Sequence, residues 1–119
     1  MTKNDIVMFL NVARPDLEET FMENICDFLI YHLEEKIRQE VLHLDQKYNG
    51  VDISLTAPYD ELYWRYVLAF LALLEGKVDV YRESQKLFEQ AWDNFCRQVF
   101  LQKENFKLSP LFEDAQEEL

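Results

Sequence analysis

The sequence predicts an all-α fold, a small antiparallel bundle of about four helices around a central apolar helix. Only two glycines and three prolines occur among 119 residues, so sites for tight turns are few. Hydrophobic residues make up 49% of the chain, and they recur at the three- and four-residue spacings typical of helices. A chain of this length supports one core. We therefore expect a helical bundle domain over residues 1–103 and a mobile C-terminal tail over residues 104–119.

A short helix is expected at the start of the chain. Thr2 or Asn4 is placed to cap it, because a side-chain oxygen at this position can accept a free amide of the first turn. Pro15 disfavours helical geometry in the residue that precedes it. The first helix should therefore end near Ala13.

A long second helix is predicted from Asp16, whose carboxylate suits a helix start, to about Leu44. Two apolar lines run along it, separated by more than a quarter turn. One line consists of Leu17, Phe21, Ile25 and Phe28, and the other of Cys26, Leu29, Leu33, Ile37, Val41 and Leu44. We expect this helix either to bend or to contact two different partners.

Residues 45–58 lose the helical periodicity and predict a loop with a short extended stretch. Pro58 is a residue favoured at helix starts, so a third helix should run from about Tyr59 to Glu75. Nearly every residue from 62 to 74 is apolar, and a helix that is apolar on all sides has to be surrounded. The third helix is therefore predicted to be the centre of the domain.

Gly76 is predicted to end the third helix in the left-handed conformation and to begin a tight hairpin into a fourth helix, from about Val78 to Gln102. Five residues of the fourth helix form an apolar stripe at heptad-like spacing: Tyr81, Phe88, Trp92, Phe95 and Val99. We expect this stripe to pack against the third helix, with Tyr66, Phe70 and Leu73 facing Phe88, Trp92 and Phe95.

Two further apolar sets exceed what a small domain needs for its own core. The first is a weaker line on the fourth helix and is predicted to be a subunit interface: Val80, Leu87, Ala91 and Leu101. The second lies in the tail and is predicted to bind a partner: Phe106, Leu108, Leu111 and Phe112.

The charge and the motifs argue against several classes of function. A net charge of −11 opposes direct binding of nucleic-acid phosphates. Cys26 and Cys96 are far apart and lack a CxxC partner, so they indicate neither a disulfide framework nor a zinc site. No secretory signal is expected at the start, and the longest apolar run, residues 62–74, is too short to span a membrane. We expect a soluble intracellular protein.

No chemistry-bearing motif stands out. Glu40 and His43 have the Glu-x-x-His spacing of di-iron bundles, but such sites need two copies of the motif and further carboxylates. His32 is expected to be a surface or interface histidine. Phosphate loops and nucleophile elbows are missing from the sequence. We therefore expect no catalytic residue, no metal and no cofactor, and a protein that is not an enzyme.

One segment resembles a known family. It begins with Pro58-Tyr59-Asp60-Glu61-Leu62-Tyr63 and continues with Tyr66, Ala69, Gly76, Tyr81, Ser84, Leu87-Phe88, Ala91-Trp92 and Phe95. The order and spacing of these residues resemble the small head-tail connector (adaptor) proteins of siphophages and prophages, and the likeness spans roughly residues 58–102. The resemblance implies a virion structural protein assembled in the host cytoplasm. It also implies a ring, commonly dodecameric, that binds the portal protein, lets DNA pass and receives a downstream stopper or tail-completion protein.

Two other functions stay open from the residues alone. A small acidic phage protein can act as an inhibitor that mimics the charge of DNA, which a monomer with carboxylates on one convex face would favour. A cellular helical interaction module is the second alternative, and a stable dimer would favour it.

Overall fold

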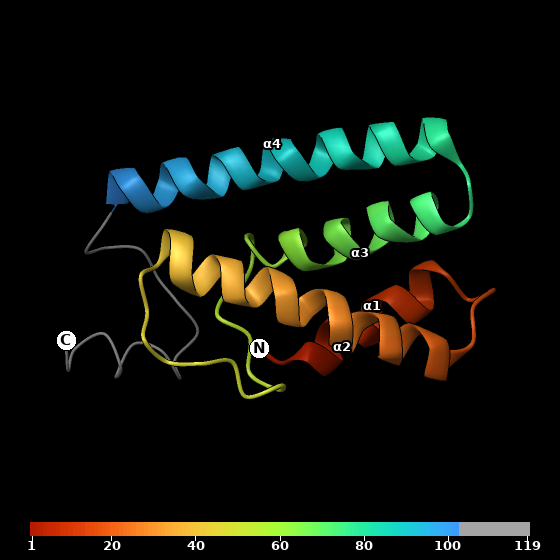
Figure 1. Ribbon diagram of the computed structural model, residues 1–119, viewed down its shortest axis with the longest axis horizontal. Helices are drawn as coiled ribbons and strands as arrows, with labels where there is room; N and C mark the ends of the chain where they lie inside the picture. Colours follow the sequence, from red (N-terminus) through yellow and green to blue (C-terminus); the bar gives the residue numbers. More distant parts are fainter. Residues whose placement is uncertain (103–119) are drawn as a thin grey trace.

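Four α-helices follow one another in the computed structural model, which describes residues 1–102. They are α1 (Lys3–Ala13), α2 (Glu19–Lys36), α3 (Glu61–Leu74) and α4 (Val78–Gln102), and a π-helical segment, η1 (Ile37–Val41), extends α2. α3 lies between α4 on one side and the α1–α2 pair on the other (Figure 1). The predicted all-α bundle with a central apolar helix is confirmed. The predicted tail and its four apolar residues, Phe106, Leu108, Leu111 and Phe112, lie outside the described residues.

α1 begins and ends where the sequence predicts. The backbone N–H of Thr2 donates to Asp5 Oδ2 at 2.9 Å, which ties the first turn to its cap. At the other end, the N–H of Arg14 still donates to the Leu10 carbonyl at 2.8 Å before the chain turns. The buried face of α1 consists of Ile6, Val7 and Leu10.

The predicted start of the second helix at Asp16 is wrong, because α2 begins at Glu19. The Asp16 carboxylate accepts hydrogen bonds from Arg14 Nε and Nη2, at 3.0 and 2.8 Å, and so pairs backward along the chain. Arg14 also donates to both carboxylate oxygens of Glu75, at 2.9 and 2.8 Å, just beyond α3. The pKa of Asp16 falls to about 2 because of its hydrogen bonds from Arg14. A side-chain ion pair has therefore displaced the expected cap.

The second helix also ends earlier than the predicted Leu44. Its last turn widens into η1, and the Leu42 N–H donates to the Ile37 carbonyl. His43 then takes a positive φ of 52°, a conformation that ends a helix. The chain crosses from there to α3 through residues 42–60.

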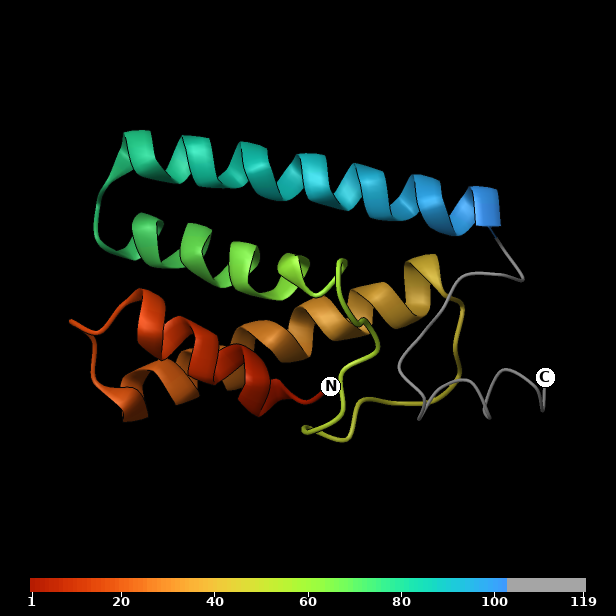
Figure 2. The ribbon, with the colours of Figure 1, turned by 180° about the vertical axis from the view of Figure 1, so that it is seen from behind.

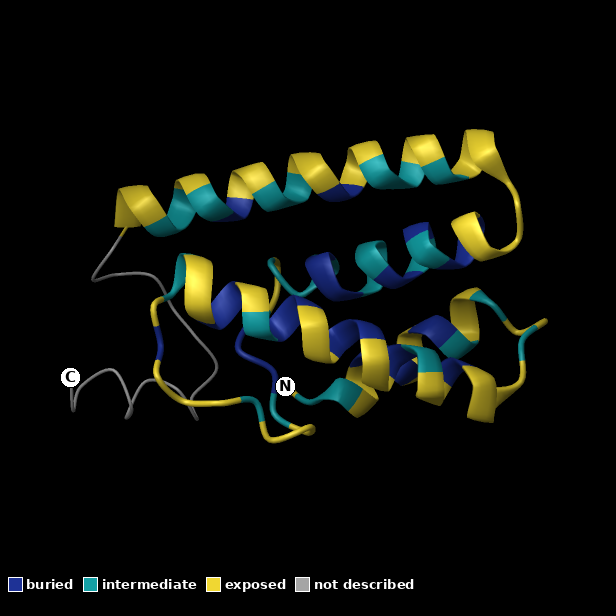
Figure 3. Ribbon diagram, in the orientation of Figure 1, coloured by how far each residue is buried: buried dark blue, intermediate teal, exposed yellow. Residues whose placement is uncertain are grey.

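That connection is partly built into the core. Ile53 and Leu55 are fully buried, although they lie in a loop. Figure 3 shows buried stretches within this connection. The Lys3 N–H donates to the Val51 carbonyl at 2.8 Å, and Thr2 and Asp52 form an isolated antiparallel bridge. The predicted extended stretch is therefore present, and it pairs with the start of the chain.

The turn between α3 and α4 has the conformation predicted from Gly76. Gly76 has a φ of +72°, in the left-handed region that favours glycine. The Lys77 N–H donates to the Ala72 carbonyl at 3.0 Å, which closes the end of α3 as a Schellman motif. α3 and α4 then run antiparallel along their length, as seen from both sides (Figures 1 and 2).

Aromatic rings fill the contact between α3 and α4. The rings of Tyr66 and Phe88 lie 5.2 Å apart, and those of Trp92 and Phe95 lie 5.8 Å apart. Phe95 is wholly buried. Leu73, predicted to face this stripe, is instead exposed, because it lies on the side of the last turn opposite the buried Leu71 and Ala72. The enclosure of α3 is thus incomplete at its end.

Candidate functional site

The predicted interface line lies mostly on the surface of α4. Val80, Leu87 and Leu101 are exposed, whereas Ala91 is half-buried against the edge of the core. The aromatic stripe packs against α3, and these three side chains lie outside the core that residues 1–102 form. Their assignment to a subunit contact stays a prediction.

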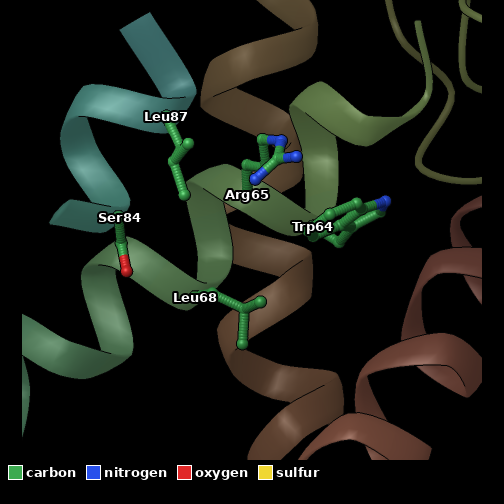
Figure 4. A pocket seen from close by; sticks show the side chains of 5 residues that line it. All are labelled: Trp64, Arg65, Leu68, Ser84 and Leu87. Atoms are coloured by element: carbon green, nitrogen blue, oxygen red, sulfur yellow. The ribbon is translucent and has the colours of Figure 1, made fainter. Parts of the chain in front are cut away.

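Leu87 also forms one wall of a small groove between α3 and α4. The other lining residues are Ser84 on α4 and Trp64, Arg65 and Leu68 on α3 (Figure 4). The hollow measures about 100 Å³ and is open to solvent. Ligand pockets commonly measure about 300–1,000 Å³, so this space suits a single side chain better than a small molecule. The sequence did not indicate the groove, because α3 was expected to be enclosed on all sides.

The groove is held in shape by contacts of its floor. The Arg65 guanidinium lies over the Trp64 ring, 4.5 Å from its centroid, and its Nε donates to Glu61 Oε2 at 3.2 Å. The Phe9 ring of α1 also lies 5.1 Å from the Trp64 ring, tilted by 40°. The Trp64 indole is therefore held between a guanidinium of α3 and a tilted aromatic ring of α1.

A second apolar surface lies on α2, and we call it the aromatic ridge: Phe21, Phe28 and Tyr31. Phe28 is 59% exposed and Tyr31 is 48% exposed, values unusual for large rings in a folded domain. His32 contributes edge contacts to both rings, with centroid distances of 4.5 and 5.7 Å. Of the two apolar lines predicted on this helix, the one containing Cys26 and Leu29 is buried. In the other line Phe21 and Phe28 are exposed, whereas Leu17 and Ile25 are half-buried against the core.

A buried polar cluster lies under the 42–60 connection, and we call it the clasp: Glu34, Arg38, Ser54 and Tyr63. All four residues are buried. Arg38 Nε donates to Glu34 Oε1 at 3.0 Å. The same oxygen accepts from the Ser54 amide at 2.6 Å and from the Ser54 hydroxyl, and Glu34 Oε2 accepts from the Tyr63 hydroxyl at 2.6 Å. The Glu34 carboxylate is thus fully engaged.

The clasp fastens the loop backbone to α2 and α3. Arg38 donates from Nη1 to the Gln46 carbonyl at 3.1 Å and from Nη2 to the Asp52 carbonyl at 3.0 Å. The Leu55 N–H donates to the Tyr63 hydroxyl at 3.2 Å. Because Glu34, Ser54 and Tyr63 are entirely shielded from solvent, a substrate cannot reach them without a change of structure. We assign the clasp a structural role.

The Tyr63 hydroxyl gives a pH-dependent test of the clasp. Burial, and then the neighbouring Glu34 charge, raise the Tyr63 pKa well above its usual value of about 10. A phenol whose pKa is higher in the folded state stabilises the fold fully below about pH 10, and that stabilisation is lost as the pH rises further. Between about pH 10 and the folded-state pKa, the free energy of unfolding of the wild-type chain should fall by about 1.4 kcal/mol per pH unit relative to that of Tyr63→Phe. Urea unfolding of both chains between pH 8 and pH 11 measures this. If the free energies of unfolding of the two chains change in the same way with pH, Tyr63 is not buried and protonated in the folded state.

The residues considered for metals or nucleophilic chemistry do not come together in residues 1–102. Glu40 and His43 are both exposed, and within this range no three His, Cys, Asp or Glu side chains gather as a metal site. Cys26 is wholly buried, and burial raises the pKa of its thiol to about 12. Cys96 is half-buried, and its pKa is also raised by burial.

Comparison with known proteins leaves the family open. The chain matches no protein-family model, and neither the curated proteins nor the solved structures contain a similar protein at a significant level. Within the described part of the chain, every helix is too short or too polar to cross a lipid bilayer.

Proposed function

We propose that this chain is a head-tail connector subunit of a tailed phage, which forms a ring under the portal, extends the DNA channel and links the capsid to the tail. The observation that carries the proposal is the exposed apolar line on α4, most of which lies outside the core that residues 1–102 form. The segment that resembles the connector family, residues 58–102, includes this line and the hairpin that presents it.

The net charge supports a conduit for DNA. With 23 acidic and 12 basic side chains, the chain repels phosphate. A channel lined by carboxylates lets DNA slide without adhering, because the protein offers few cations to replace the counterions of the duplex. The same charge would serve an acidic inhibitor, but a monomeric inhibitor does not need a second apolar line on α4.

Leu87→Glu is expected to abolish ring formation and leave the monomer folded. Leu87 is 39% exposed, so a carboxylate there remains hydrated in the free chain, but it would be buried without a partner between subunits. Circular dichroism and analytical ultracentrifugation with portal rings measure the two effects. Arg82→Gln is the matched control, because it changes the net charge by the same amount at an exposed position of α4 that points away from the line. Unfolding of the Leu87→Glu monomer would place Leu87 in the core instead.

The portal contact is assigned to the tail residues Phe106, Leu108, Leu111 and Phe112. Burial of four such side chains stabilises a contact by roughly 1.5–3 kcal/mol each, and fixing the backbone costs about 1–2 kcal/mol per residue. One copy should bind weakly, and linked copies in a ring should bind firmly through effective concentration.

Deletion of residues 104–119 is therefore expected to abolish binding to portal rings. The thermal midpoint should change little, since residues 1–102 already bury a shared set of apolar side chains. Co-sedimentation with purified portal rings of the same phage measures binding, and calorimetry measures the midpoint. If the truncated chain still decorates portals at normal occupancy, the anchor is in the bundle. If neither chain binds the portal, the connector role itself is wrong.

A further inference from the structure

We propose that residues 45–55, which we call the strap, form a lid that opens as one unit and lifts off Glu34, Arg38 and Tyr63 while the helices stay folded. The strap leads from the end of η1 toward α3 and runs beside the start of the chain (Figures 1 and 2). The closed form is the one described above, and the open form is a minor state. This inference does not depend on the connector role.

Side chains, and not the helix backbones, hold the strap down. Arg38 donates to two of its carbonyls, at 3.1 and 3.0 Å. Glu34 accepts a hydrogen bond from the Ser54 amide at 2.6 Å. The Tyr63 hydroxyl accepts one from the Leu55 amide at 3.2 Å. The strap can therefore separate from α2, η1 and α3 without breaking a hydrogen bond inside any of these helices.

The buried ion pair lowers the cost of opening. Glu34 and Arg38 are four residues apart on α2 and η1, so their contact of 3.0 Å does not depend on the strap. When the strap lifts, water reaches both charges and the pair persists. Hydration then recovers part of the free energy that burial of the two charges costs in the closed form. An apolar surface in the same place would gain nothing from contact with water.

Only a small part of the core moves with the strap. Ile53 and Leu55 are its two members of the buried apolar cluster, and Tyr48 packs against the edge of that cluster. Most other buried apolar side chains in residues 1–102 belong to the helices. Segments with few buried apolar contacts open at a lower free energy than the core does. The helices therefore keep most of their shared core when the strap opens.

The start of the chain holds the outer edge of the strap. The Lys3 amide donates to the Val51 carbonyl at 2.8 Å, and Thr2 lies opposite Asp52 in an antiparallel bridge. The Lys3 ammonium also pairs with Asp27, so the chain start is tied to α2. Opening separates the strap from the chain start as well as from the clasp.

Hydrogen exchange of the full chain, followed by NMR, tests whether the strap opens on its own. The Ser54 and Leu55 amides report on the strap, and the amide of the buried Val67 reports on α3. After correction for intrinsic rates, the two strap amides should exchange within about threefold of each other and at least about 100-fold faster than Val67. Phe88→Leu, which trims a buried ring between α3 and α4, should accelerate Val67 about tenfold and leave the strap amides within about threefold.

Two results would overturn the proposal. Equal rates for the strap amides and Val67, with equal acceleration by Phe88→Leu, would mean that the strap opens only when the whole domain unfolds. Rates of Ser54 and Leu55 that differ more than about tenfold would mean that these residues do not move as one unit.

A disulfide between the strap and the chain start supplies a second test. Thr2→Cys and Asp52→Cys, in a Cys96→Ser background, place two thiols at facing positions of the bridge, where side chains lie close together. The linked variant should show exchange of Ser54 and Leu55 slowed at least tenfold relative to the same protein after reduction. Thr2→Cys alone in that background is the control, and oxidant should leave its rates unchanged. An unchanged rate in the linked variant would overturn the proposal.

Discussion

Arg38→Met is expected to lower the free energy of unfolding by about 3–5 kcal/mol, because it breaks a buried ion pair from one side. Arg38 and its partner Glu34 are both buried, with 2% and 0% of their surface exposed. After the substitution, the Glu34 carboxylate keeps only its hydrogen bonds from Ser54 and Tyr63. The Gln46 and Asp52 carbonyls lose the hydrogen bonds that Arg38 donates to them. An unpaired buried charge with two orphaned carbonyls accounts for the size of the loss.

Urea unfolding at pH 7 measures this effect, and two further variants separate its causes. Arg97→Met removes an exposed arginine from α4 and should change the stability by less than about 0.5 kcal/mol. Arg38→Met with Glu34→Gln should be less destabilised than Arg38→Met alone, since the amide carries no charge and its oxygen still accepts from Ser54. A loss below about 1 kcal/mol for Arg38→Met would mean that the clasp is not closed in solution.

The clasp also explains how a loop of polar composition is held in place. Residues 42–60 contain little helix-forming pattern, yet Ile53 and Leu55 reach the core. The Arg38 bonds to Gln46 and Asp52 fix the backbone on the approach to these two residues. The connection joins α2 and η1 to α3, so a fixed loop keeps these helices in a constant relation.

The sequence predicted the elements whose signals are local. The α3–α4 hairpin was found because Gly76 ends one apolar helix and an amphipathic stripe starts directly after it. The start of α2 was missed because Arg14 competes for the carboxylate of Asp16, and cap preferences do not include such a contact. α2 and η1 also stop short of Leu44, since the π-helical turn is not encoded by hydrophobic period alone.

The clasp and the groove were missed for a different reason. Glu34 and Arg38 are four residues apart, the spacing of a common surface pair, and each directly follows a residue of the buried line, Leu33 or Ile37. Only their distant partners, Ser54 and Tyr63, mark them as buried. The groove exists because α1 and α4 leave a strip of α3 uncovered between them. Neither arrangement follows from the spacing of residues within one helix.

Phe95→Ala is expected to destabilise the fold by about 3–5 kcal/mol, the usual range for removal of a fully buried aromatic ring. Phe95 has no exposed surface and lies against Tyr59 and Trp92, with centroid distances of 5.9 and 5.8 Å. Trp92 is only half-buried, and part of its ring is covered by the Lys36 ammonium 4.9 Å away. Trp92→Ala should therefore cost less, although tryptophan is the larger residue. Thermal or urea unfolding of the two variants decides the order. A larger loss for Trp92→Ala would mean that α4 is rotated about its axis relative to α3, with its aromatic stripe centred on Trp92.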